Sequence, residues 1–187
     1  MSSDFERTLR RLKPQKQWRQ LKPRRESELS FLGIGAEKPR SFLYDTTVYV
    51  DILQGRFPTA HETMLRAANA WHSTVAESEL ASACALLDPA HADTRDVIKR
   101  VTTVIERIPP HRTVCPDREI WRDAVILTGT IARLQGIRKP DRRRIFNDAV
   151  IFATARKHGH TVLTRNIVDF DFLLQLDPSG RVMFYRV

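Results

Sequence analysis

The sequence predicts an α/β fold with a central parallel β-sheet flanked by helices. Short apolar runs rich in β-branched and aromatic residues, such as FLYDTTVYV and TVLT, alternate along the chain with longer segments of helical periodicity. Strands separated by helical segments form parallel sheets, because each connection must cross over a face of the sheet. A third observation is that acidic residues stand beside these apolar runs, where an unpaired buried carboxylate is costly.

Composition and charge favour a globular protein with a polyanionic partner. The 187 residues suit one domain with an extension, and 42% hydrophobic with 28% charged residues is a globular composition. The formal net charge is +9 and the pI is about 10.1. This excess favours nucleic acid as a partner, ahead of a membrane surface, although net charge alone also fits a soluble protein that happens to be basic.

Cysteine usage and hydropathy indicate a reducing compartment. Cys84 and Cys115 are the two cysteines, and they form neither a metal-type pair nor a disulfide framework. The first residues, MSSDFERTLRRLKPQKQW, contain no apolar signal core, and no run approaches the roughly 20 apolar residues of a membrane span. We therefore expect a cytoplasmic protein with no membrane contact.

Residues 1–40 differ from the rest of the chain. They contain eleven Lys and Arg but five Asp and Glu, a local net charge of +6, and few apolar residues. A segment of this composition cannot build its own core. We interpret residues 1–40 as a basic, partly flexible and partly helical N-terminal extension, and residues 41–187 as the folded domain. The extension has three candidate roles: a solvated tail, an RNA-contacting arm, or a segment that folds on a partner.

The predicted elements of the domain begin with a buried strand over Phe42–Val50, an apolar run with β-branched and aromatic residues. Amphipathic periodicity predicts a helix over Thr59–His72. The β-prone run Ser73–Ala76 leads into a helix over Glu77–Leu87, which ends at Asp88 because the residue before a proline avoids the helical conformation.

The second half continues the alternation of helices and strands. Apolar residues recur at a helical period after Asp93, Pro116 suits a first helical turn, and Gly136 and Gly159 suit helix ends. The predicted helices are Asp93–Ile108, Pro116–Leu134 and Pro140–His158, and the predicted strands are His111–Val114, Thr161–Thr164 and Arg181–Val187.

Four acidic residues far apart in the sequence are candidates for one metal site: Asp45, Glu79, Asp148 and Asp169. Three of them follow or lie on predicted strands, and ligands of parallel sheets bind beyond the carboxyl ends of the strands. Carboxylate clusters suit Mg²⁺ or Mn²⁺, which drive the cleavage of phosphodiesters. Acidic residues in the site and basic residues around it are the pattern expected of a nuclease.

Several assignments within this set remain open from the residues alone. Glu77 competes with Glu79, because residues two apart on a helix diverge by about 200° and one of them faces the pocket. Asn166 and Asp169 are rival fourth ligands, and Asp171 is a weaker candidate. Asp148 also fits an ordinary polar position on an amphipathic helix, Asp45 fits an acceptor for loop hydrogen bonds, and Asp51 fits a surface acid if a helix begins before it.

Hydroxyl and basic residues near the acids have predicted supporting roles. Thr46 or Thr47 is placed to orient the Asp45 carboxylate. Thr164 is suited to bind a phosphate oxygen or to position a carboxylate, and Asn147 is suited to assist Asp148 through its amide. Arg165 is predicted to bind substrate phosphate.

Four blocks in order resemble the PIN-domain superfamily: FLYDTTVYVDIL, STVAESELA, NDAVIFATARKHGHTVLTRNIVDF and VMFYRV. Within the superfamily they are most similar to VapC-type ribonuclease toxins of type II toxin–antitoxin modules, including plasmid-stability relatives. The resemblance covers about residues 41–187. It favours Glu79 over Glu77, since the family's Ser-to-Glu-Leu block falls on Ser73 to Leu80, and it departs from many relatives where Asn166 stands at an acidic position.

The resemblance implies a metal-dependent endoribonuclease with a PIN-like fold. Its catalytic residues would be Asp45, Glu79, Asp148 and Asp169, which with Asn166 would hold one or two Mg²⁺ or Mn²⁺ ions. It implies an RNA substrate, unpaired rather than duplex, and a cognate antitoxin protein as a partner. It also implies a homodimer, for which the predicted helices 59–72 and 93–108 are the candidate interface.

Two other classes of function compete with this hypothesis. The first is a catalytically decayed PIN scaffold that binds RNA or a partner, which Asn166 in the fourth block leaves open. The second is a phosphatase with an aspartate nucleophile, because Asp45 follows an apolar strand. That chemistry usually needs a second aspartate two residues later, where this chain has Thr47, so it ranks below the others.

Overall fold

The computed structural model describes residues 4–33, 39–58 and 69–187, and in this part of the chain five parallel strands form one sheet. The strand order is β3-β2-β1-β4-β5, so the first strand lies at the centre of the sheet and later strands are added on both sides of it. The strands are β1 Ser41–Tyr44, β2 Asn69–Ser73, β3 Thr113–Val114, β4 Thr161–Thr164 and β5 Val182–Phe184.

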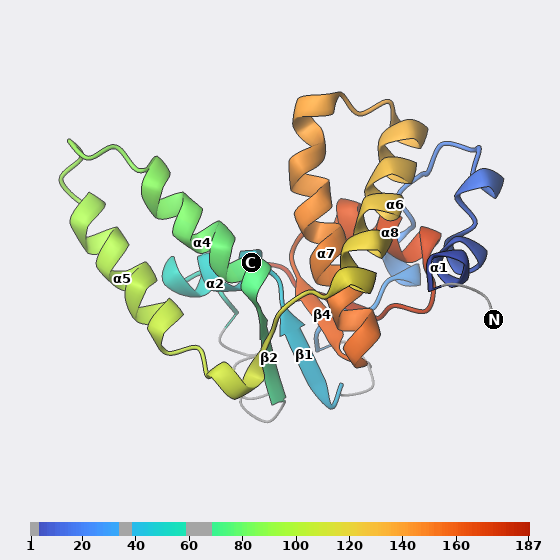
Figure 1. Ribbon diagram of the computed structural model, residues 1–187. Coiled ribbons are helices and arrows are strands. Elements are labelled where there is room, and N and C mark those ends of the chain that lie inside the picture. The colour runs from blue at the N-terminus through green and yellow to red at the C-terminus, as the bar shows by residue number, and fades with distance from the viewer. Residues whose placement is uncertain (1–3, 34–38, 59–68) are drawn as a thin grey trace.

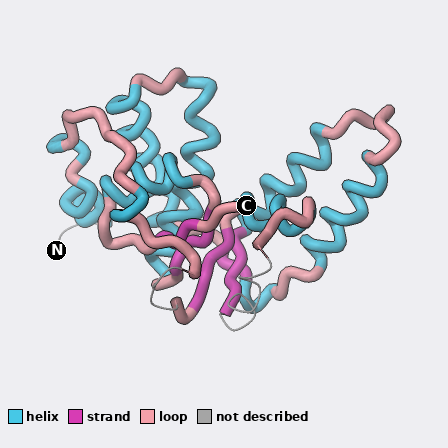
Figure 2. The backbone as a smooth tube through the Cα atoms, turned by 180° about the vertical axis from the view of Figure 1, so that it is seen from behind, coloured by secondary structure: helices cyan, strands magenta, loops and turns pink. Residues whose placement is uncertain are grey.

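Helices cover both faces of the sheet, which makes the molecule a three-layer α/β structure (Figure 1). Helices α2, α4 and α5 lie on one side, and α6, α7 and α8 lie on the other. Seen from behind, the α4–α5 hairpin stands apart from the α6–α7 pair (Figure 2). The α-helices are α1 Asp4–Leu12, α2 Thr46–Leu53, α4 Thr74–Leu86, α5 Thr94–Glu106, α6 Arg118–Gln135, α7 Arg142–His158 and α8 Ile167–Leu176.

The predicted α/β class and parallel sheet are confirmed, but the first strand is shorter than predicted. Strand β1 ends at Tyr44, and helix α2 begins at Thr46, within the run assigned to a strand over Phe42–Val50. Asp45 is the N-cap of α2, and its carboxylate accepts a hydrogen bond from the backbone N–H of Thr47. A capping aspartate stabilises a helix start, and this local signal outweighs the β propensity of the residues that follow.

The second strand lies earlier than predicted, for a related reason. Residues 69–73 form β2, so the predicted helix over 59–72 is wrong at its carboxyl end, and its residues 59–68 lie outside the described residues. Ser73 ends β2 and caps α4, accepting a hydrogen bond from the N–H of Val75. The predicted strand over Ser73–Ala76 is therefore helical after its first residue.

The carboxyl-terminal half agrees more closely with the prediction. Helices α5, α6 and α7 and strand β4 lie within two residues of their predicted bounds, and Gly136 and Gly159 end α6 and α7 with φ values of 64° and 73°. Helix α8 was not predicted. Its apolar residues are buried on several sides, which leaves no clear helical period in the sequence.

Helix α7 fills the centre of the larger helical layer. Nine of its residues are buried, among them Val150, Ile151 and Phe152, and it packs on α6, α8 and β4. The rings of Phe42, Phe170 and Phe184 contribute to the same core. None of the helices in the described part of the chain combines the length and the hydrophobicity that crossing a bilayer requires.

The described part of the N-terminal extension lies against the domain. Leu12 and Leu32 are buried in the common core, and α1 packs on α6. Phe31 forms a parallel bridge with Phe184, because the N–H of Phe184 donates to the carbonyl of Ser30 and the N–H of Leu32 donates to the carbonyl of Phe184. The extension thus covers the β5 edge of the sheet, where unpaired backbone groups would otherwise be exposed.

An ionic network fastens the extension to α6 and α7. Asp123, which is fully buried, accepts hydrogen bonds from Thr8 at 2.9 Å, Arg11 at 2.5 Å and Arg156 at 2.7 Å. Arg11 and Arg156 also pair with the buried Asp177. Five side chains distant in sequence are joined in this way, so the charges of α1 are matched to acids buried in the domain.

We predict that Asp123→Ala destabilises the protein strongly. The substitution removes one of the two buried acids that Arg11 and Arg156 share, and breaking such a buried pair costs about 3 kcal/mol or more. Urea denaturation measures the change in the free energy of unfolding. The control is Asp93→Ala, an exposed acid whose loss should cost about 0.5 kcal/mol or less. Equal effects of the two substitutions would show that the network does not hold the extension.

Candidate active site

The predicted acids converge at the carboxyl edge of the sheet, where neighbouring strands end. Asp45 follows β1, and Thr164 to Asn166 follow β4, its partner in the sheet. Glu79 comes from α4 and Asp148 from α7, on opposite sides of this edge. A pocket of about 610 Å³ is lined there by Asp45, Thr46, Thr47, Glu79, Arg144, Asp148, Arg165 and Asn166, together with apolar residues.

Asp45 is held in place by two threonines, one in the first turn of α2 and one at the end of β4. Its Oδ2 accepts hydrogen bonds from the Oγ1 atoms of Thr47 and Thr164, both at 2.7 Å. The residue is only 2% exposed. Thr164 is thus a residue that positions a carboxylate, one of its two predicted roles. Because Asp45 is also the N-cap of α2, one side chain joins β1, β4 and the start of a helix.

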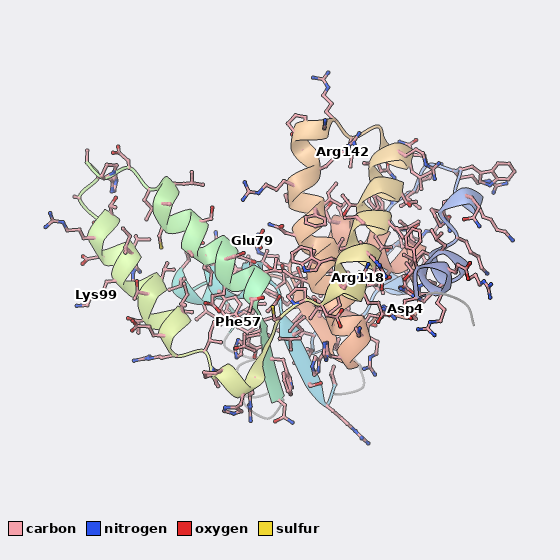
Figure 3. All side chains as sticks on the ribbon, in the orientation of Figure 1. Asp4, Phe57, Glu79, Lys99, Arg118 and Arg142 are labelled. Atoms are coloured by element: carbon pink, nitrogen blue, oxygen red, sulfur yellow. The ribbon has the colours of Figure 1, made fainter. Side chains whose placement is uncertain are left out.

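Glu79 faces the pocket from α4, and its two oxygens have separate partners. Thr46 Oγ1 donates to Oε2, and Asn147 Nδ2 donates to Oε1 at 2.7 Å. Glu77 does not line this pocket. Figure 3 shows Glu79 near the middle of the molecule, between the α4–α5 hairpin and the α6–α7 pair. Thr46 therefore orients Glu79, while the predicted support of Asp45 falls to Thr47.

Asn166 connects Asp148 and Asp169. Its Nδ2 donates to Asp148 Oδ2 at 3.0 Å and to Asp169 Oδ2 at 2.9 Å, and its side chain caps α8. Asp169 is buried and forms an ion pair of 3.1 Å with the exposed Arg144. Asn166 and Asp169, the two candidates for the fourth ligand, are thus hydrogen-bonded to each other, and Asn166 is also hydrogen-bonded to Asp148.

The carboxylates of the pocket act on one another electrostatically. Burial raises the pKa of Asp148 well above its usual value, and the negative charges of Asp45, Asp169 and Glu79 raise it further. Burial also raises the pKa of Asp45, against the opposing effect of hydrogen bonds from Thr47 and Thr164. Like charges held this close favour either a shared proton or a bound cation.

Asp51 is not the surface acid that its sequence position allowed. It is fully buried under the pocket, where it accepts hydrogen bonds from Arg56 at 2.9 Å, Arg165 at 2.8 Å and Tyr185 at 2.8 Å. Arg165, predicted to bind substrate, lines the pocket while its Nε is fixed by Asp51. These hydrogen bonds to Asp51 stabilise the loop after β4.

Arg144, at the rim, was missed at the sequence level. It lies three residues before Asn147 in an arginine-rich run, RRR, which gave no sign that its last member would meet Asp169. Asp171, the weaker candidate, lies away from the pocket and pairs with Arg24 of the extension at 2.5 Å. Asp169 and Asp171 are two residues apart on α8, so their side chains leave the helix in different directions.

The donor set of the pocket fits a divalent cation in its chemistry. In residues 4–33, 39–58 and 69–187, no three His, Cys, Asp or Glu side chains meet in one tight ligand cluster. The acids lie at one pocket, where their negative charges repel one another. The side chains that donate hydrogen bonds to Asp45, Glu79 and Asp148 are neutral threonines and asparagines. Oxygen ligands with unneutralised negative charge are what Mg²⁺ and Mn²⁺ prefer.

The five-stranded parallel sheet, its flanking helices and the acidic pocket at the carboxyl edge define a PIN-like fold, as the sequence predicted. No family model and no curated protein matches the sequence. Solved structures of VapBC complexes do match the fold, so the resemblance to VapC-type proteins is confirmed at that level.

Three of these structures illustrate the likeness. The VapBC2 structure from Rickettsia felis, bound to a promoter DNA fragment, has a chain that aligns with a TM-score of 0.55 and 14% identity, covering 78% of this chain and 99% of that one. DNA-bound VapBC from Salmonella typhimurium gives 0.55 and 17%, covering 77% and 97%. VapBC-1 from nontypeable Haemophilus influenzae gives 0.53 and 15%, covering 78% and 96%.

We predict that Asp148→Asn stabilises the metal-free protein. A raised pKa means that the ionised carboxylate destabilises the folded state, and this cost appears as the pH rises from the unfolded pKa through the folded one. The asparagine oxygen can still accept from Asn166. Denaturation in chelator should show a gain of about 1 kcal/mol at pH 8 that shrinks toward pH 4. Asp96→Asn, an exposed acid of α5, serves as the control; a matching gain there would contradict the prediction.

Proposed function

We propose that this protein is a metal-dependent endoribonuclease and the toxin of a toxin–antitoxin pair. The observation that carries the proposal is the convergence of Asp45, Glu79 and Asp148, with Asp169 behind Asn166, on one pocket at the carboxyl edge of a PIN-like sheet. The fold shared with chains of VapBC complexes supports it. The net charge of +9 supports a polyanionic substrate.

Asp45, Glu79 and Asp148 would hold one or two Mg²⁺ or Mn²⁺ ions, with Asp169 or Asn166 completing the set. When bound, such an ion acidifies a water molecule and neutralises charge on the leaving oxygen. Thr47 and Thr164 fix the Asp45 carboxylate, and Thr46 and Asn147 fix Glu79.

Other groups of the pocket are suited to transfer a proton and to bind the substrate. A carboxylate of the pocket is suited to accept a proton from the attacking water. Arg165 keeps guanidinium N–H groups besides its Nε for a phosphate of the substrate. Unpaired RNA is the expected substrate, because its backbone and bases are accessible to such a pocket.

The partner we propose is a small antitoxin that inserts a segment into the acidic pocket. The pocket is lined from α2, α4 and α7, and Arg144 and Arg165 are among its lining residues. A homodimer through α5 is the expected assembly, since Ile98 is partly exposed on this helix. Copurification with the product of an adjacent reading frame would test the partner, and light scattering would test the dimer.

We predict that Asp45→Asn abolishes RNA cleavage without unfolding the protein. Asparagine caps a helix as well as aspartate, so α2 should persist, while one ligand charge is lost. Cleavage of a single-stranded RNA with Mn²⁺ should fall by about a hundredfold or more. Asp93→Asn should leave the rate unchanged. Full activity of Asp45→Asn would remove the acidic pocket from the mechanism.

The competing candidate is a decayed PIN scaffold that binds RNA or a partner, and it is favoured by Asn166 at a position acidic in many relatives. Calorimetry with Mn²⁺ separates the two functions. A nuclease site should take up Mn²⁺, and Asp148→Asn should weaken the uptake by about tenfold or more through loss of a ligand charge. No uptake by the unaltered protein would favour the decayed scaffold.

A further inference from the structure

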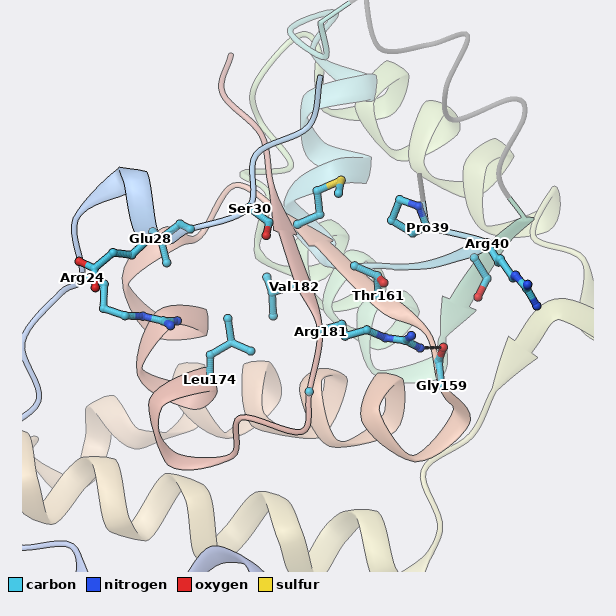
Figure 4. A pocket seen from close by; sticks show the side chains of 14 residues that line it. Arg24, Glu28, Ser30, Pro39, Arg40, Gly159, Thr161, Leu174, Arg181 and Val182 are labelled. Atoms are coloured by element: carbon cyan, nitrogen blue, oxygen red, sulfur yellow. Dashed lines mark hydrogen bonds between the residues drawn. The ribbon is translucent and has the colours of Figure 1, made fainter. Parts of the chain in front are cut away.

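A second cavity, larger than the acidic pocket, lies at the opposite edge of the sheet (Figure 4). Its volume is about 830 Å³. Ser41, Thr161 and Val182 line it at the amino ends of β1, β4 and β5. These strands run about four residues to the acidic edge, so the two sites are roughly 10 Å or more apart.

One wall of this cavity comes from the N-terminal extension. Arg24, Glu28, Leu29 and Ser30 line it from one side, facing the strand ends and Leu174 of α8. The resemblance to PIN domains begins near residue 41, so the wall is built from a segment outside it. The cavity therefore gives the extension a role that the acidic pocket does not explain.

The charge of the cavity favours an anion. Arg24, Arg40 and Arg181 line it, against Glu28 as an acidic lining residue. Arg24 is anchored by Asp171, which accepts from its Nε at 2.5 Å and from its backbone N–H at 2.8 Å. Its Nη2 is buried and finds no hydrogen-bond partner among the described residues. The two contacts with Asp171 thus hold this arginine rigidly at the wall of the cavity.

Arg181 approaches from the other side, where it donates to the carbonyl of Gly159. Figure 4 shows Arg24 extending toward Leu174, with Arg181 across the cavity beside Gly159. Leu29, Leu174 and Val182 supply apolar surface between the two arginines. Guanidinium groups match the geometry of phosphate oxygens, and an apolar wall with a few charged groups is typical of small-molecule sites of this volume.

We propose that this cavity binds a small phosphorylated ligand of the size and chemistry of a mononucleotide. Arg181 binds its phosphate, the apolar wall at Leu29, Leu174 and Val182 contacts its uncharged body, and Arg24 adds positive charge at the opposite end of the cavity (Figure 4). The site belongs to the junction of the extension and the domain. It is independent of the acidic pocket, whose charge repels the same ligand.

Calorimetry on the full-length protein in chelator tests the proposal without any metal or RNA cleavage. The probes are the four nucleoside 5′-monophosphates, inorganic phosphate and adenosine. At least one monophosphate should bind saturably and more tightly than adenosine or inorganic phosphate. Arg181→Glu should weaken this binding by about tenfold or more, the effect of losing one charge-assisted hydrogen bond.

Two further variants keep the test independent of folding and of total charge. Ser30→Trp fills the cavity without removing a charge, so it should also abolish binding. The fold should persist, because Ser30 contributes only its backbone carbonyl to the bridge with β5. Arg100→Glu, on the distant α5, makes the same charge change and should leave binding intact. The proposal is overturned if no monophosphate binds, if adenosine binds as tightly, if short RNA alone binds, or if Arg100→Glu weakens binding as much as Arg181→Glu.

Discussion

The buried carboxylate of Asp45 is the constraint on which the rest of the site depends. It follows the first strand directly, caps the helix that comes next, and accepts hydrogen bonds from a threonine of that helix and a threonine of β4. Because it is fixed by three elements at once, the edge of the sheet has one geometry. Glu79, Asp148 and Asn166 are then brought to it by helices whose own starts are capped or packed nearby. The acidic pocket is therefore a consequence of how the strands end.

Burying acids next to one another is unfavourable in the absence of a counter-charge. The raised pKa of Asp148 and Asp45 expresses this cost in the folded protein. Elsewhere the molecule buries acids differently: Asp51, Asp123 and Asp171 are each paired with arginine. The contrast separates acids paired with arginine, which stabilise the fold, from Asp45 and Asp148, whose hydrogen-bond donors are neutral. This difference is what the proposed nuclease function would require.

The N-terminal extension forms ion pairs with buried acids that stabilise the fold, and it also covers parts of the domain. Its arginines reach Asp123, Asp171 and Asp177, which lie in the domain away from the acidic pocket. Its residues 30–32 cover the edge of β5, and its residues 24–30 close one side of the arginine-lined cavity. The positive charge that suggested an RNA-contacting arm is thus partly used inside the molecule, and the remainder is available to a ligand or partner.

The sequence by itself determined the α/β class and most helices of the second half, because periodicity, glycine stops and apolar runs are local signals. It also singled out three acids, Asp45, Glu79 and Asp148, that the structure brings to one pocket. It misplaced the end of β1 and the position of β2, since a capping aspartate or serine competes with β propensity over only a few residues. The ion pair of Arg144 with Asp169, the burial of Asp51 and the cavity beside the extension were decided by tertiary structure. Each depends on side chains that meet only when distant elements pack, and no spacing along the chain encodes such a meeting.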